Sequence, residues 1–205
     1  MVIQPHDLIQ LTDAQNRMIT PSTIPGWVHE SLKRSPYVVV RRAPIENGKV
    51  PIGVRGADRI QRFAAHVSID AIEKHIRPEQ LISKKEWKED KRIDLKAFRS
   101  LDVVVKVLKD YQLEWGPAGS VGFELASGQP TVNEESDLDI VIRGNENLTL
   151  NNAQTIISEL GKAPARIDPQ VETEEGAFSL IEYSRGTNPI MLRTINGPIL
   201  VNNPF

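Results

Sequence analysis

One short pattern in the second half of the sequence constrains the fold more than any other. The run Ser136-Asp137-Leu138-Asp139-Ile140-Val141-Ile142 alternates acidic and apolar residues before it becomes wholly apolar. In a strand, this alternation places Asp137 and Asp139 on one face and the apolar side chains of residues 138, 140 and 142 on the other. Two neighbouring carboxylates repel each other, and a hard divalent cation between them removes that cost. The pattern therefore predicts a strand with one acidic, metal-binding face.

A glycine-serine pair, Gly119-Ser120, stands seventeen residues before Asp137. A tight turn that opens a helix presents backbone N–H groups to phosphate, and glycine allows close approach. Each motif alone is weak, because an isolated D-x-D is usually solvated surface and an isolated Gly-Ser is usually a simple turn. Their order along the chain resembles the polymerase-beta-like nucleotidyltransferase superfamily, with additional residues, 122–135, between turn and strand. The resemblance implies metal-assisted nucleotidyl transfer.

Further motifs occur from one end of the chain to the other. They are Pro5-His6-Asp7-Leu8-Ile9, Ile52-Gly53-Val54-Arg55-Gly56, Arg59-Ile60-Gln61-Arg62-Phe63-Ala64-Ala65, the run 119–128, the run 166–173, Gly176-Ala177-Phe178-Ser179-Leu180, Leu192-Arg193-Thr194, Gly197-Pro198-Ile199-Leu200-Val201 and Asn203-Pro204-Phe205. In this order they closely resemble the malonate decarboxylase holo-[acyl carrier protein] synthases, a family also called phosphoribosyl-dephospho-CoA transferases.

The resemblance implies a reaction, a donor and an acceptor. The phosphoribosyl-dephospho-CoA group of 2'-(5''-triphosphoribosyl)-3'-dephospho-CoA is expected to pass to a serine of the apo acyl carrier subunit of malonate decarboxylase, with release of pyrophosphate. The alternatives are a nucleotidyltransferase that acts on a citrate-lyase type carrier or on a small molecule, and a binding module without catalysis.

The same resemblance suggests roles for individual residues. Asp137 and Asp139 are expected to hold Mg²⁺, or Mn²⁺ in its place, and Gly119 with Ser120 to hold the β- and γ-phosphates. Asp168 is the candidate third carboxylate. It could instead be a turn residue before a proline, or the base that takes the serine proton. Glu172 and Glu182 are weaker candidates for the third carboxylate.

Three arginines lie in a short stretch of the first half. Arg55 and Arg59 are candidate phosphate or substrate contacts, because guanidinium groups bind phosphate oxygens in pairs. Arg62 is a further candidate, with an exposed surface position as the alternative.

Charge and composition narrow the function classes. Residues 1–110 hold 20 Lys/Arg and 14 Asp/Glu, whereas residues 111–205 hold 5 and 13. A basic half suits phosphates or an acidic protein partner, and an acidic half suits metal binding. The overall charge of −2 argues against a nucleic-acid partner. The chain has no cysteine, no run of eighteen apolar residues and no secretory signal pattern, so a cytoplasmic protein without a membrane span is expected.

Periodicity predicts an α+β fold with two parts. Residues 1–90 are expected to form a basic α/β region for substrate or partner binding, and residues 91–205 a nucleotidyltransferase-like catalytic domain whose mixed sheet is packed with helices. Helices are expected at 27–35, 58–71, 95–111, 121–126 and 150–160. Strands are expected at 37–42, 50–54, 113–115, 138–142, 165–173, 177–184, 190–194 and 199–201. His66 falls in the second of these helices.

Overall fold

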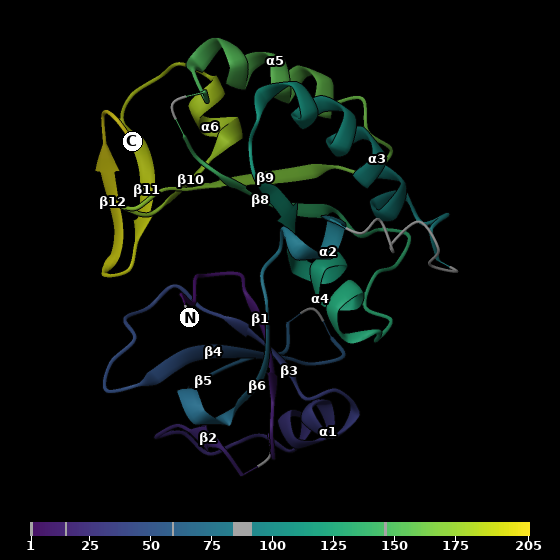
Figure 1. The fold of residues 1–205 in the computed structure, drawn as a ribbon, viewed down its shortest axis with the longest axis vertical. Coiled ribbons are helices and arrows are strands. Elements are labelled where there is room, and N and C mark those ends of the chain that lie inside the picture. The colour runs from purple at the N-terminus through teal and green to yellow at the C-terminus, as the bar shows by residue number, and fades with distance from the viewer. Residues whose placement is uncertain (1, 15, 59, 84–91, 146) are drawn as a thin grey trace.

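The computed structural model describes residues 2–14, 16–58, 60–83, 92–145 and 147–205. Within these ranges the strands form two six-stranded sheets, one from each half of the chain, with helices packed on them. Figure 1 shows the two halves one above the other, with the N-terminal half below and the helix-covered C-terminal half above. The predicted α+β class is confirmed. None of the helices in these ranges is both long enough and apolar enough to cross a membrane.

The first sheet is antiparallel throughout and has the order β2-β5-β4-β3-β1-β6. One helix, α1, packs on it through Val28 and Leu32, which join the apolar core of this half. The elements are β1 (Leu8–Leu11), β2 (Met18–Ile19), α1 (Gly26–Arg34), β3 (Tyr37–Val40), β4 (Lys49–Arg55), β5 (Arg62–Ser68), a 3-10 turn η1 (Ile69–Ala71) and β6 (Ile72–Ile76).

The helix predicted at 58–71 is wrong, because this segment contains strand β5. Ala65 and Val67 are buried with a spacing of two, whereas Ile60, which the helical pattern counted, is 92% exposed. Seven consecutive residue pairs join β5 to β4. The hydrogen bonds of this ladder and the burial of one face of the sheet therefore outweigh the helical spacing of the apolar residues. His66 accordingly lies on a strand.

The second sheet has the order β12-β11-β10-β9-β8-β7, in which only β8 and β9 run parallel among the pairs of the described residues. Helices α3, α5 and α6 cover the face turned away from the first half (Figure 1). The elements are α2 (Gln80–Ser83), α3 (Lys96–Leu108), a 3-10 turn η3 (Lys109–Tyr111), β7 (Trp115–Pro117), α4 (Gly119–Ser127), β8 (Leu138–Arg143), α5 (Leu150–Leu160), β9 (Ile167–Glu172), β10 (Ala177–Ser179), α6 (Leu180–Ser184), β11 (Ile190–Thr194) and β12 (Gly197–Val201).

Most predicted elements of this half are confirmed, and two need correction. The strand predicted at 177–184 ends at Ser179, whose side chain accepts a hydrogen bond from the backbone N–H of Glu182 and so caps helix α6. The strand predicted at 113–115 is β7, which begins at Trp115. The predicted domain boundary at 90/91 lies outside the described residues.

Of the residues between the glycine turn and β8, those up to Ser127 belong to helix α4, and residues 128–137 form a loop that folds back on it. The carboxylate of Glu124, only 4% exposed, accepts hydrogen bonds of 2.7 Å from the backbone N–H groups of both Thr131 and Val132. Arg92 forms an ion pair with Glu124 at 3.2 Å and also donates to the carbonyl of Val132. The additional residues noted in the sequence therefore belong to the packed structure of the second half.

Gly116, on β7, packs against the segment that connects the two halves. A Cβ at this position would lie 2.0 Å from the carbonyl carbon of Pro78 and 2.1 Å from its oxygen. We expect Gly116→Ala to lower the free energy of unfolding by about 1–3 kcal/mol, because backbone must move to make room. Urea denaturation would measure this change. Gly26→Ala is the matched control, since no atom lies within 4 Å of its Cβ. Equal stability of the two variants would show that the Pro78 segment moves freely.

Candidate active site

A cavity of about 440 Å³ lies between the two sheets and collects several of the predicted site residues. The first sheet contributes Arg41, Arg55 and Arg62, and the N-terminal segment contributes His6. The second half contributes Gly119 and Asp139. We call this space the aspartate cavity. Its basic side comes from one half of the chain and its acidic residue from the other.

Gly119 and Asp139 meet because β7 and β8 are antiparallel neighbours. The backbone N–H of Ala118 donates to the carbonyl of Asp139 at 2.9 Å, which holds the start of α4 beside the start of β8. Gly119 has a φ of 56°, and a Cβ there would lie 1.8 Å from Oδ2 of Asp139. Only glycine fits this position, because a side chain would both strain the backbone and displace the carboxylate.

Two further predicted carboxylates lie close to Asp139, which lines this cavity. Asp139 on β8 is directly paired with Asp168 on β9, and Asp137 precedes Asp139 by two residues. Burial raises the pKa of Asp139, and the charges of Asp137 and Asp168 raise it further, while His6 and Arg55 oppose the shift. A cation bound to this carboxylate would offset both the cost of burying its charge and the repulsion from the neighbouring carboxylates.

The three carboxylates do not by themselves enclose a metal ion. Among the described residues, no group of three or more His, Asp or Glu side chains has a metal-holding arrangement. The oxygen-only donor set suits Mg²⁺, which is commonly bound by one or two carboxylates together with substrate phosphates. The metal-binding roles of Asp137, Asp139 and Asp168 therefore stay predictions.

The remaining predicted residues lie in different places. Ser120 is only 7% exposed and is not among the residues that line the aspartate cavity. Arg55 lines the cavity and pairs across the β4–β5 ladder with Arg62. Arg59 lies outside the described residues. Glu182 accepts a hydrogen bond from the backbone N–H of Met191 and does not line the cavity.

A network of charged residues joins the two halves beside the cavity. Glu172, at the end of β9, accepts a hydrogen bond from Arg42 and lies 3.3 Å from Nε2 of His6. Arg143, its neighbour on β8, donates to Glu79 at 2.6 Å and lies 3.9 Å from Asp7.

Asp7 is completely buried at the centre of this network. Its Oδ2 contacts Nε2 of His75 at 2.6 Å and accepts the backbone N–H of Gln4 at 2.9 Å. Burial raises the pKa of Asp7, whereas Gln4, His75 and Arg143 act in the opposite direction. The preceding residue, His6, has a φ of 73°, an uncommon conformation for a residue with a side chain.

Sequence reasoning assigned no role to most of this network. Alternation along β8 and β9 indicates that Arg143 and Glu172 share a face with Asp139, but it cannot name the partners that face them from the other half. The Pro5-His6-Asp7-Leu8-Ile9 motif was the available signal for His6 and Asp7. Glu172, a weaker candidate for the third carboxylate, forms ion pairs with His6 and Arg42 in this structure, and its candidate role stays a prediction.

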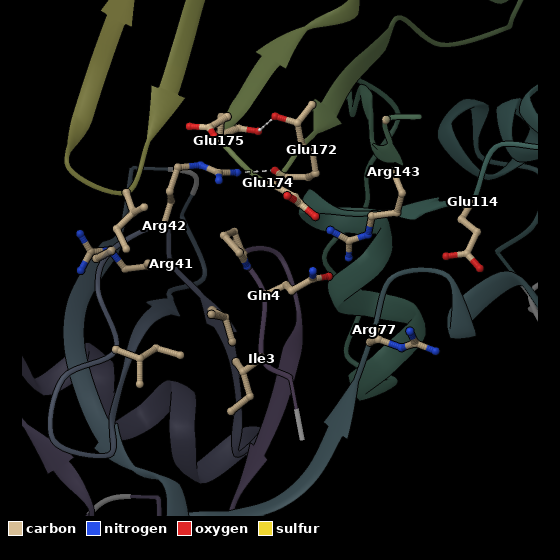
Figure 2. Close-up of a pocket in the computed structure, with 18 residues that line it drawn as sticks. Ile3, Gln4, Arg41, Arg42, Arg77, Glu114, Arg143, Glu172, Glu174 and Glu175 are labelled. Atoms are coloured by element: carbon tan, nitrogen blue, oxygen red, sulfur yellow. Dashed lines mark hydrogen bonds and ion pairs between the residues drawn. The ribbon is translucent and has the colours of Figure 1, made fainter. Parts of the chain in front are cut away.

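A second cavity, of about 670 Å³, is shown with its lining residues in Figure 2. Its wall includes Arg42, Arg77, Arg143 and Glu172, and we call it the arginine cavity. Arg41 lines both cavities, so the two spaces adjoin.

The Glu172 network makes a prediction about stability and pH. Burial alone would raise the pKa of Glu172, but the hydrogen bond from His6 and the charges of Arg42 and His6 together lower it. Glu172→Gln should reduce the free energy of unfolding at pH 7 by about 3 kcal/mol, because it leaves Arg42, which is largely shielded from solvent, without its carboxylate partner. A carboxylate with a lowered pKa stabilises the fold above its ordinary pKa of 4.5 and loses this effect as the pH falls through its folded value.

Denaturation curves at several pH values would check this prediction. The difference between wild type and Glu172→Gln should shrink as the pH falls below about 4.5, because Glu172 is then protonated in the unfolded chain before it is protonated in the folded protein. Glu174→Gln, at an exposed position in the adjacent turn, is the control and should change little. A pH-independent difference would indicate packing rather than charge as its cause.

Comparisons with known proteins agree on one family. The family model of the phosphoribosyl-dephospho-CoA transferase MdcG N-terminal domain matches residues 4–78, and that of the C-terminal domain matches residues 82–204. Proteins named phosphoribosyl-dephospho-CoA transferase are similar along the whole chain. The one from Pseudomonas fluorescens is 37% identical and covers 98% of this chain and 93% of its own. The one from Azotobacter vinelandii is 35% identical, with 98% and 94% covered. No solved structure gives a significant match.

Proposed function

The chain belongs to the phosphoribosyl-dephospho-CoA transferase family, and from that premise we propose its reaction. The protein is a transferase. It moves the phosphoribosyl-dephospho-CoA group from triphosphoribosyl-dephospho-CoA to a serine of the apo acyl carrier subunit of malonate decarboxylase, and pyrophosphate leaves. The observation that carries this proposal is the contact of Gly119 with Asp139 in a cavity walled by arginines. The reaction takes place in the cytoplasm and involves no nucleic acid, in keeping with a cysteine-free chain of net charge −2.

The proposed step is one displacement at phosphorus. The serine oxygen forms a bond to the phosphorus attached to the ribose, and the bond from that phosphorus to the oxygen of pyrophosphate breaks. The serine proton passes to a base, and the bonding electrons leave with pyrophosphate. Negative charge therefore grows on the leaving group, and positive groups must face it.

The residues around the aspartate cavity suit this distribution of charge. A bound Mg²⁺, or Mn²⁺ in its place, would neutralise phosphate charge, with Asp137 and Asp139 as its protein ligands. The start of α4, at Gly119-Ser120, presents backbone N–H groups to the phosphates. Because Ser120 is buried, we assign its contribution to the backbone rather than to the hydroxyl. Arg55 faces Asp139 from the first sheet and contacts the same phosphates.

Asp168 is the third carboxylate of this proposal. Asp168 lies opposite Asp139 in the parallel ladder, and this position supports the proposal that both carboxylates bind the same metal ion. Asp168→Asn would then raise the Mg²⁺ concentration needed for half-maximal activity. If Asp168 were instead the base for the serine proton, the variant would lower the rate at every Mg²⁺ concentration by the same factor.

Intact-mass spectrometry of the carrier tests the proposed function. The apo acyl carrier subunit of malonate decarboxylase, incubated with this protein, Mg²⁺ and the donor, should gain the mass of one phosphoribosyl-dephospho-CoA group. We expect Asp137→Asn and Asp139→Asn each to slow this gain at least about 100-fold, because each removes charge that holds the metal. Glu134→Gln, an exposed acid just outside the motif, should react like wild type.

Stability in chelator separates loss of chemistry from loss of fold. The raised pKa of Asp139 means that its charge destabilises the metal-free protein at neutral pH. Asp139→Asn should therefore be as stable as wild type in chelator, or more stable. A carrier that gains no mass with active donor and folded protein would contradict the malonate decarboxylase assignment, and a citrate-lyase type carrier or a small-molecule acceptor would be tried next.

A further inference from the structure

We propose that the arginine cavity binds the pantetheine arm of the donor, and that Arg41 binds the diphosphate that precedes this arm. The inference rests on the proposed function and adds a second subsite to it. The donor carries a triphosphate at one end, an adenosine in the middle, and a diphosphate followed by pantetheine at the other. Such a molecule needs an elongated cleft with two positions for phosphate.

The structure has two cavities that share one lining residue, Arg41, and together they provide these positions. The aspartate cavity, of about 440 Å³, holds Gly119, Asp139 and Arg55 and takes the triphosphate. The arginine cavity, of about 670 Å³, adjoins it, and Arg41 lines both. Pockets of a few hundred cubic ångströms each hold ligands of drug size, so the two together suit a donor larger than either part. The order of groups along the donor then places its diphosphate at Arg41.

Arg41 is available for a diphosphate. It is exposed, and within the described part of the chain its side chain makes no hydrogen bond or ion pair. The neighbouring Arg42 is bound to Glu172, and Arg143 is bound to Glu79, so neither offers a full charge to a ligand. The phosphate position at this junction therefore depends on Arg41.

The wall of the arginine cavity suits a neutral amide chain better than a further polyanion. Its four arginines, Arg41, Arg42, Arg77 and Arg143, share the wall with four glutamates, Glu114, Glu172, Glu174 and Glu175, so basic and acidic residues are equal in number there (Figure 2). Gln4 and Thr173 add uncharged polar side chains to the wall. Ile45 and Ile195, which are exposed, are among its apolar side chains. Pantetheine combines two amides, a hydroxyl and a dimethyl group, so it uses both kinds of surface.

Equilibrium binding of two unreactive probes tests the subsite on the full chain. Dephospho-CoA contains the diphosphate and the arm, whereas ADP lacks the arm but carries more negative charge. We expect wild type to bind dephospho-CoA at least about tenfold more tightly than ADP in calorimetry, because only the arm fills the arginine cavity. Arg41→Ala should weaken both probes by about tenfold. Arg99→Ala, on the exposed face of α3, should weaken neither.

Filling the cavity gives the decisive comparison. Ala43→Trp places an indole at a residue that lines the arginine cavity. The variant should bind dephospho-CoA as weakly as ADP, while its affinity for ADP stays that of wild type. Ile195→Trp, at a position 49% exposed, makes the same test if Ala43→Trp fails to fold. Equal binding of the two probes by wild type, or a preference that survives both folded variants, would overturn the proposal.

The transfer assay distinguishes this failure from failure of the proposed function. If the protein transfers the group to the carrier but binds dephospho-CoA no more tightly than ADP, only the proposal of the pantetheine subsite is contradicted. If Ala43→Trp abolishes the preference for dephospho-CoA but the wild-type protein transfers nothing to the carrier, the subsite proposal is supported and the proposed acceptor is contradicted.

Discussion

The parallel pairing of β8 with β9 is the interaction on which the arrangement of the cleft depends. It sets Asp139 opposite Asp168 and, four residues further along the strand, Arg143 opposite Glu172. Leu138, Ile140 and Ile142 point to the other face, where they pack into the core under the helices. Because side chains alternate along a strand, the same register that buries the apolar residues brings a row of charges to face the first sheet.

That row of charges needs partners, and the first half of the chain supplies them. Asp7, Arg42 and His6 reach across to Arg143 and Glu172, and Asp7 itself is fully buried. Buried ion pairs add little net stability, but removal of one partner leaves an expensive uncompensated charge. A small apolar cluster, which includes Leu8, Ile76 and Phe123, supplies adhesion between the halves without this penalty. The ion pairs fix how the halves face each other, and the cleft between them follows.

The sequence predicted local features of the site better than its assembly. The strand at 138–142 and the turn at Gly119 were predictable, because alternation and a glycine before a helix are local patterns that depend little on distant contacts. The segment 58–71 was not, since its helical spacing competes with a β4–β5 ladder that only the folded chain reveals. His6 and Arg42 could not be placed beside Glu172, because 130 residues separate Arg42 from it and no periodicity links them.

The difference in charge between the two halves of the chain places basic and acidic residues on opposite sides of one cavity. The basic half contributes Arg41, Arg55 and Arg62 to the aspartate cavity, and the acidic half contributes Asp139. Neither half alone could bind a triphosphate and a metal ion, since arginines without carboxylates lack the metal ligands and carboxylates without arginines repel the phosphates. The site therefore exists only where the sheets meet. The contacts that hold the halves in register consequently set the distance between the carboxylates that we propose as metal ligands and the arginines that we propose as phosphate contacts.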